Sequence, residues 1–144
     1  MDRIEDCISF QVGKAAQQVN RRARQLLAPY GVTPIQYAVL KVLSQTEAMS
    51  GVAIGERLVL DSASITGVLD RLEGAGLVER RRHPTDRRAQ LVAATPRATG
   101  MMSQLDAAMD RLNREAADPM DVENAAFRNR LRRLGDAKHW EFDV

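Results

Sequence analysis

The feature that most constrains the fold is a pair of short helical patterns that leads directly into a pair of short strand patterns. The first helix is predicted over residues 50–58, with Ser50 as its cap. The second starts at Asp61 or Ser62, either of which can cap it, and ends near the glycines of residues 74–76. Two short helices joined by only a few residues are typical of a helix-turn-helix.

The strand patterns cover residues 77–81 and 88–94 and flank a short polar stretch, residues 83–86. The proline and the aspartate in this stretch favour a turn, so the sequence predicts a β-hairpin. His83 is expected to be an ordinary turn residue rather than a pH sensor.

The predicted hairpin is strongly basic. Residues 79–88 contain five arginines against two acids, a net charge of +3, which leaves −1 for the rest of a chain whose total is +2. The basic character is therefore assigned to this one segment. A short basic segment suits a polyanionic partner, and a solvated turn is the alternative interpretation.

Four further helices complete the predicted secondary structure, in the order α-α-α-α-β-β-α-α. Thr33, Pro34 and Gln36 have the spacing of a capping box with proline at the first helical position. Thr95 and Pro96 repeat the combination of a cap and a first-position proline after the hairpin. Apolar residues at three- and four-residue steps place the four helices over residues 4–28, 34–46, 97–115 and 121–134.

Composition bears on size and location. The 144 residues fit one domain or two small lobes that share a core, and no apolar run approaches the roughly 20 residues of a membrane-spanning helix. The acidic N-terminus lacks the apolar core of a secretion signal. One cysteine, Cys7, cannot form an internal disulfide, which fits a reducing compartment. We therefore expect a cytoplasmic protein without a membrane partner.

No pattern in the sequence points to catalysis. The two histidines and the cysteine are far apart and lack metal-ligand spacing. No phosphate loop, dinucleotide-binding fingerprint or nucleophile elbow is found. We expect no catalytic residues, no metal and no cofactor, and hence a protein that is not an enzyme.

The helix predicted to end near residues 74–76 has two contrasting sides. On a helical wheel, with about 100° per residue, one side is a core stripe made of Ile65, Val68, Leu69 and Leu72. The opposite side carries small, hydroxyl-bearing and charged residues, namely Ala63, Ser64, Thr66, Gly67, Asp70 and Arg71. Such a side can approach the major groove of DNA closely and hydrogen-bond to base edges. An ordinary solvent-exposed face is the alternative.

Three stretches, in this order and spacing, resemble a known family. They are residues 69–80 (LDRLEGAGLVER), residues 84–88 (PTDRR) and the pair Ala94-Thr95. The chain resembles the multiple-antibiotic-resistance regulators (MarR), winged-helix transcription factors of bacteria and archaea, over residues 8–134.

The resemblance implies a mainly α fold with a small β-hairpin wing (α+β). Residues 31–96 would form a winged helix-turn-helix, and the N- and C-terminal helices, in residues 1–30 and 97–144, a dimerisation lobe. The implied function is that of a homodimeric, sequence-specific DNA-binding transcriptional regulator, a ligand-responsive repressor of a pseudo-palindromic operator. The alternative is a winged-helix protein-interaction module that does not bind DNA.

The resemblance also implies roles for individual residues. Asp86 and Arg88 match the wing signature, in which the arginine enters the minor groove and the aspartate pairs with another arginine. That partner is one of residues 80–82, and the sequence leaves open which; a solvated strand edge is the alternative for these arginines. The candidate DNA-binding residues are Ala63, Ser64, Thr66, Gly67, Arg71, Arg80, Arg81, Arg82, Asp86, Arg87 and Arg88.

Two further surfaces follow from the resemblance. The dimer seam is expected to include part of the helix over residues 97–115 together with Ile4, Ile8, Phe127, Leu131 and Leu134, whereas a monomer would bury these residues internally. A small anionic or phenolic effector is expected between the two lobes, in a pocket bordered by Gln36, Tyr37, Leu40 and Met101. Core packing is the alternative for these four residues.

Cys7 is expected to be a buried or inert thiol. Some members of the family sense peroxides through a cysteine in the first helix, and such a thiol needs a lowered pKa. Here Glu5 and Asp6 lie beside the thiol and should raise its pKa, and the chain offers no second cysteine.

Overall fold

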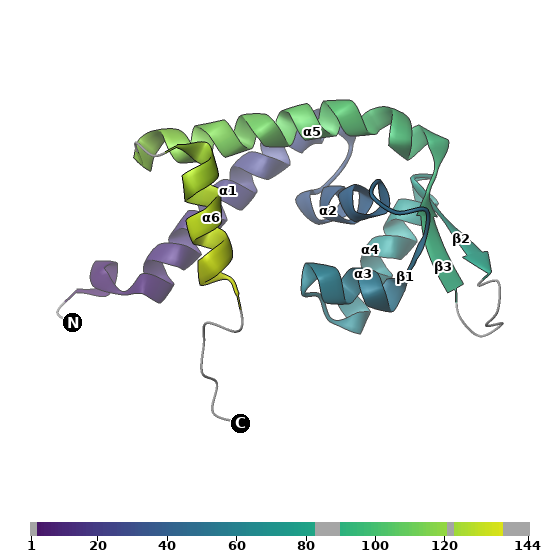
Figure 1. The fold of residues 1–144 in the computed structure, drawn as a ribbon, viewed down its shortest axis with the longest axis horizontal. Coiled ribbons are helices and arrows are strands. Elements are labelled where there is room, and N and C mark those ends of the chain that lie inside the picture. The colour runs from purple at the N-terminus through teal and green to yellow at the C-terminus, as the bar shows by residue number, and fades with distance from the viewer. Residues whose placement is uncertain (1–2, 83–89, 121–122, 137–144) are drawn as a thin grey trace, which may run out of the picture.

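The computed structural model describes residues 3–82, 90–120 and 123–136 (Figure 1). The described chain is mostly helical with one small sheet, so the predicted fold class is confirmed. The α-helices are α1 (Ile8–Leu27), α2 (Pro34–Leu43), α3 (Gly51–Leu58), α4 (Ser62–Gly74), α5 (Pro96–Ala117) and α6 (Asn124–Leu134). Short 3-10 helices and strands complete the fold: η1 (Ile4–Asp6), η2 (Ala28–Tyr30), η3 (Asp118–Met120), β1 (Met49–Ser50), β2 (Val78–Arg82) and β3 (Gln90–Ala94).

The elements form an arch. Helix α5 runs along its top, with α1 beneath it, and α2, α3 and α4 lie with the sheet at one end (Figure 1). Helix α6 descends from the other end of α5. Because α5 directly follows β3, one continuous helix connects the two ends of the arch.

Side-chain caps begin four of the six α-helices at the positions that the sequence predicts. Thr33 and Gln36 form the capping box: the backbone N–H of Thr33 donates to the Gln36 side chain at 2.9 Å, and the Thr33 hydroxyl accepts from the Gln36 N–H at 3.3 Å. Helix α4 is capped by Asp61 rather than Ser62, through a 2.7 Å bond from the N–H of Ser64. Ser50 caps α3 and Thr95 caps α5. Each cap stabilises its helix by about 1 kcal/mol.

The sheet has three antiparallel strands in the order β1-β3-β2. The two longer strands form the predicted hairpin, with Val78 opposite Ala94 and Arg82 opposite Gln90. Strand β1, which pairs Met49 with Val92, was not predicted, because two residues are too few to show an alternating pattern. The predicted turn, residues 83–86, lies outside the described residues.

The structure corrects several helix boundaries. The helix predicted over residues 4–28 is interrupted at Cys7, whose extended backbone (φ −77°, ψ 119°) separates η1 from α1. Helix α2 ends at Leu43 instead of residue 46. At this end the hydroxyl of Ser44 donates to the carbonyl of Lys41 at 2.8 Å. Helix α5 runs two residues beyond the predicted 115, and α6 begins at residue 124 instead of 121.

The core lies between the C-terminal end of α1, helix α5, the sheet and helices α2, α3 and α4. Its largest fully buried side chains are Leu27, Val39, Leu40, Ile54, Leu72 and Leu105. The stripe predicted on α4 is buried as expected, since Ile65, Val68, Leu69 and Leu72 are each at most 7% exposed. Burial of this stripe fixes which side of α4 faces outward.

Among the described residues, no single helix has both the length and the apolar character to cross a membrane. Within the described residues, the segments Ile8–Tyr30 and Pro34–Leu43 are long and apolar enough only when taken together, and a 70° bend separates them.

Candidate nucleic-acid interface

A tight turn joins α3 to α4. Val59 adopts the left-handed conformation (φ 55°), and the N–H of Leu60 donates to the carbonyl of Gly55 at 2.9 Å. A Cβ on Gly55 would lie 3.2 Å from the Leu60 carbonyl oxygen, so glycine permits this close approach. The two helices therefore pack as a helix-turn-helix, with the apolar stripe of α4 turned inward.

The outward side of α4 carries the residues that the sequence selects for base contacts. Ala63, Ser64, Thr66 and Arg71 are exposed, and Gly67 is partly exposed. The hydroxyl of Ser64 donates to Asp61 at 2.8 Å, and that of Thr66 donates to the Ser62 carbonyl at 2.7 Å. These bonds leave both oxygens with accepting capacity toward a ligand.

The three arginines of β2 have different environments. Arg80 is half-buried and pairs with Asp70 and Glu73 of α4. Arg81 pairs with Glu79 on its own strand at 2.6 Å, and Arg82 is exposed at the end of the strand. The structure therefore places the Arg80 side chain against α4, in a partly exposed group of ion pairs.

The remaining predicted wing residues, His83, Asp86, Arg87 and Arg88, lie outside the described residues. Their roles, including the arginine partner of Asp86, stay predictions.

Assigning the basic character to the hairpin alone was wrong. Residues 124–133, which form most of α6, contain four arginines and no acid, a net charge of +4. These arginines, Arg128, Arg130, Arg132 and Arg133, are all exposed. A charge count in a sliding window along the whole chain would have found this segment.

The residues predicted to border an effector pocket have separate environments. Gln36 completes the capping box, Leu40 is fully buried in the core, and Met101 packs against that core. Tyr37 donates its hydroxyl to Asp106 of α5 at 2.9 Å. Leu40 therefore fits the core-packing alternative, and the pocket itself stays a prediction.

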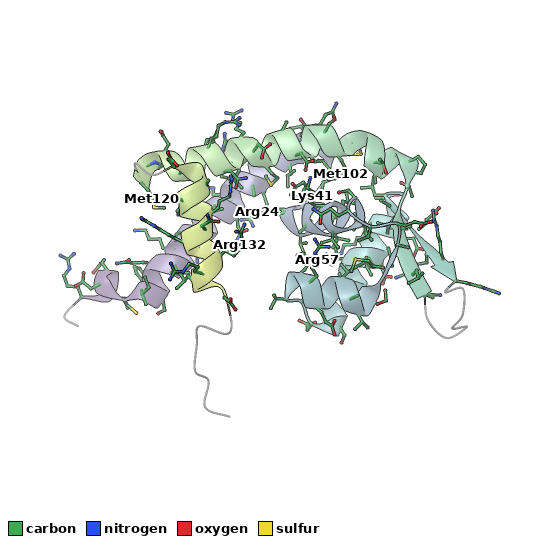
Figure 2. All side chains as sticks on the ribbon, viewed as in Figure 1. Arg24, Lys41, Arg57, Met102, Met120 and Arg132 are labelled. Carbon is green, nitrogen blue, oxygen red and sulfur yellow. The ribbon has the colours of Figure 1, made fainter. Side chains whose placement is uncertain are left out.

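Asp106 joins α2 to α5 through both of its carboxylate oxygens. One accepts from Tyr37, and the other accepts from Lys41 at 2.7 Å. Lys41 lies on α2, beneath α5, in Figure 2. Burial, together with the Asp106 carboxylate, raises the pKa of Tyr37 above its ordinary value of 10.0. This contact fixes the position of the helix-turn-helix end of the arch relative to α5.

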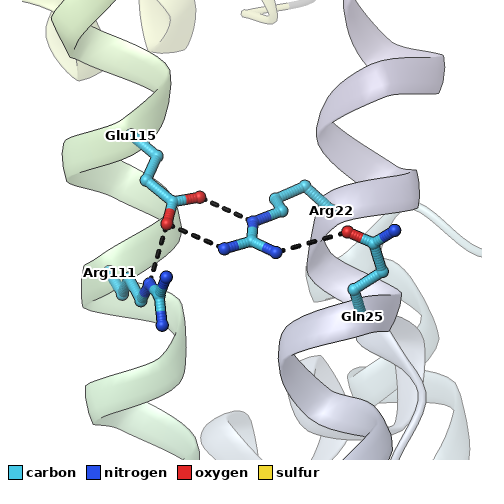
Figure 3. A network of polar contacts seen from close by, with 4 residues as sticks. All are labelled: Arg22, Gln25, Arg111 and Glu115. Atoms are coloured by element: carbon cyan, nitrogen blue, oxygen red, sulfur yellow. Dashed lines mark hydrogen bonds and ion pairs between the residues drawn. The ribbon is translucent and has the colours of Figure 1, made fainter.

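A second polar network joins α1 to α5 (Figure 3). Arg22 donates to Glu115 through Nε at 2.6 Å and through Nη2 at 2.9 Å, and Arg111 donates to the same carboxylate at 2.7 Å. Because both guanidiniums favour the charged carboxylate, and the Arg22 bonds contribute most, the pKa of Glu115 is lowered to about 2.

The Glu115 network predicts an acid dependence of stability. The carboxyl has an ordinary pKa of 4.5 and a folded-state pKa of about 2, so its stabilising contribution is present above pH 4.5 and is lost as the pH falls toward 2. We expect Glu115→Gln to remove this part of the acid destabilisation. Thermal unfolding of both proteins between pH 2 and pH 7 measures it, and parallel pH profiles would contradict the prediction.

Cys7 lies at the N-cap of α1, with its sulfur 3.1 Å from the Ser9 hydroxyl. Hydrogen bonding by that hydroxyl, and by the backbone N–H groups of Ser9 and Phe10, lowers the pKa of the thiol below its ordinary value of 9.0. The expectation of a raised pKa was wrong, because these hydrogen bonds favour the thiolate by more than burial disfavours it. The thiol is also partly exposed rather than buried.

This geometry predicts that Ser9→Ala raises the thiol pKa. The change removes the largest of the lowering contacts and leaves the two backbone donors. The pH dependence of alkylation by iodoacetamide measures the pKa of this single cysteine, with Cys7→Ser as the blank. Identical alkylation profiles for wild type and Ser9→Ala would refute the assignment.

The packed pair α3–α4, followed by a short antiparallel hairpin, defines the chain as a winged helix-turn-helix protein. Residues 32–89 match the model of the MarR family. The crystal structure of a probable transcriptional regulator from Pseudomonas aeruginosa is similar, with 32% identity and a TM-score of 0.85, over 92% of this chain and 99% of that one. The chain belongs to the MarR family.

Two other relatives extend the comparison. The HTH-type transcriptional regulator TtmR of Methylorubrum extorquens is 38% identical over 72% of this chain and 53% of that protein, so the chain spans about half the length of this relative. The repressor CouR, known from Rhodococcus jostii RHA1, has been solved on a 23-mer DNA duplex. It aligns with a TM-score of 0.86 at 22% identity, over 94% of this chain and 97% of that one, a likeness of fold alone.

Proposed function

We propose that this chain is a sequence-specific DNA-binding transcriptional regulator, acting as a ligand-responsive repressor. The observation that carries the proposal is the exposed small and hydroxyl-bearing side of α4, held beside an arginine-bearing strand in a member of the MarR family. Such a helix can read base edges in the major groove, while arginines of the wing contact phosphates and the minor groove. The proposed role is not catalytic, and it places the protein with the DNA in the cytoplasm.

The proposed DNA-binding unit is residues 31–96, and residues 1–30 and 97–144 form the proposed dimerisation region. An apolar groove of about 480 Å³ between α1 and α6 supports this division, since it is lined by Ile8, Val12, Leu131 and Leu134. Ile8 and Leu131 are 60% and 50% exposed. Exposure of apolar side chains to water is unfavourable, and a second copy of the chain packed on the groove would cover them. A twofold dimer would present two α4 helices about 34 Å apart to a pseudo-palindromic operator.

An effector is part of the proposal. CouR has been solved bound to p-coumaroyl-CoA. We propose a small anionic or phenolic effector that binds one geometry of the dimer better than the other and so changes the separation of the two α4 helices.

The proposal is tested by DNA binding as a function of salt. A duplex selected by the protein from a random-sequence pool is titrated by fluorescence anisotropy between 50 and 200 mM salt. Neutralising Z phosphates should give a slope of about −0.9Z in a plot of log affinity against log salt. A protein-interaction module would select no duplex and show no titration, which would overturn the proposal.

Arg88→Ala tests the predicted wing contact. We expect affinity for the selected duplex to fall by about tenfold or more, because a minor-groove arginine is lost. The melting temperature and the oligomeric state should stay unchanged. Unaltered affinity would remove Arg88 from the interface.

A further inference from the structure

We propose that Arg80 is a positioning residue that fixes the wing strand β2 to helix α4, rather than a residue that contacts DNA. Its consequence for DNA binding rests on the proposed function above. The ion pairs that join β2 to α4 through Arg80 do not depend on that function.

The guanidinium of Arg80 is directed at α4. Arg80 lies in the middle of β2, opposite Val92, and its side chain is 28% exposed against 49% for Arg81. Its Nη2 pairs with Asp70 and its Nη1 with Glu73, so both terminal nitrogens of the guanidinium are directed at carboxylates of one helix. Each terminal nitrogen of this side chain therefore has an acceptor on α4.

Electrostatics also support the proposal. Asp70 and Glu73 are three residues apart on α4, so their like charges are neighbours on one side of the helix. In the sequence they lie on either side of Arg71, one of the exposed residues proposed to contact DNA. Without a cation between them, these carboxylates would repel each other and the phosphates of a bound duplex. Arg80 offsets the negative charge of the two carboxylates. If the same guanidinium turned to a phosphate, that charge would no longer be offset.

The Arg80 contact lies between the two elements proposed to bind DNA. Helix α4 is proposed to enter the major groove, and the wing, which begins with β2, is proposed to enter the minor groove. Arg80 is the charged bridge between these two elements, and the buried Val78 lies two residues earlier on the same face of the strand. The Arg80 contact therefore fixes the distance and angle between the two parts of the DNA reader.

Arg82 provides a matched control. It lies two residues beyond Arg80 on the same face of β2, but it is exposed at the end of the strand. Removal of either arginine changes the net charge equally, and the structure assigns different consequences to the two changes.

The experiment compares Arg80→Met, Arg82→Met and the pair Asp70→Asn with Glu73→Gln, alone and combined, on the selected duplex between 50 and 200 mM salt. We expect Arg80→Met to weaken binding about tenfold without reducing the salt slope by the roughly 0.9 of one phosphate contact. Neutralising both carboxylates should restore affinity to within about threefold of wild type. The same pair should give no such rescue of Arg82→Met, because coupling requires contact.

Arg80→Lys separates the two roles further. Lysine keeps the charge and can replace arginine at a phosphate, but its single ammonium cannot bridge two carboxylates as a fork does. We expect Arg80→Lys to bind DNA more weakly than wild type but better than Arg80→Met, because lysine keeps the offsetting charge and loses the fork. Wild-type affinity for Arg80→Lys, or a salt slope reduced by about 0.9 in Arg80→Met without rescue, would overturn the proposal.

Thermal unfolding keeps this outcome separate from failure of the proposed function. If wild type binds no duplex, the function is wrong, and the Arg80 connection is still measured by a cycle of the same variants. Coupled shifts in the melting temperature between Arg80→Met and the carboxylate pair support the connection, and purely additive shifts refute it. The fully neutral triple variant should fold, because uncharged side chains of similar shape often replace an ion pair without loss.

Discussion

Gly67→Glu is expected to abolish specific DNA binding while making the folded protein more stable. Gly67 lies on the outward side of α4, and no atom lies within 4 Å of a Cβ built there. Replacing a helical glycine by a good helix former stabilises by about 0.5–1 kcal/mol. The carboxylate, however, would enter the groove among phosphates, where a like charge costs several kcal/mol. We expect affinity for the selected duplex to fall by about a hundredfold or more.

Gly100→Glu is the matched control. Gly100 is an exposed glycine of α5 that also has open space around its Cβ, and the substitution changes charge and helix propensity in the same way. It lies on α5, outside the residues proposed to contact DNA. We expect the same gain in melting temperature with DNA affinity nearly unchanged. Equal losses of affinity in the two variants would show that net charge, and not the position on α4, controls binding.

Leu72→Ala is expected to cause the largest loss of stability. Leu72 is fully buried and belongs to the stripe that packs α4 into the core. Truncation of a buried leucine costs about 2–5 kcal/mol, because apolar contacts are lost and a cavity remains. For a chain of this size we expect the melting temperature to fall by roughly 10 °C. Calorimetry or circular dichroism during heating measures the shift.

Leu72→Met controls for the identity of the side chain. Methionine has a similar volume and flexible torsions, so a buried Leu→Met change costs less than about 1.5 kcal/mol. If Leu72→Ala and Leu72→Met melt together with wild type, α4 does not pack as described.

Local sequence signals predicted most of the fold. The caps at Thr33, Ser50, Asp61 and Thr95, and the buried stripe of α4, depend on residues only three or four positions apart, where the chain itself fixes the geometry. The break at Cys7 and the two-residue strand β1 were missed, because neither interrupts the apolar pattern of its surroundings.

The candidate site was harder to predict, because charge alone does not reveal a partner. Arg80 belongs to a run of three arginines that looks uniform in sequence, yet only folding brings it against carboxylates seven and ten residues earlier. The arginines of α6 were missed because they lie in a separate helix, outside the basic hairpin. The pKa of the Cys7 thiol was predicted in the wrong direction, because only folding brings the Ser9 hydroxyl and the backbone donors to the sulfur.

The direct passage from β3 into α5 has a mechanical consequence. Thr95 caps α5 while its hydroxyl donates to the Gly76 carbonyl at 2.8 Å, so one side chain connects the start of α5 to the segment between α4 and β2. Twenty-two residues of α-helix form a lever about 33 Å long. A tilt of about 5° at one end displaces the other by about 3 Å, the full reach of a hydrogen bond. A tilt of α5 by a few degrees is therefore large enough to move the proposed DNA-binding unit out of position on DNA.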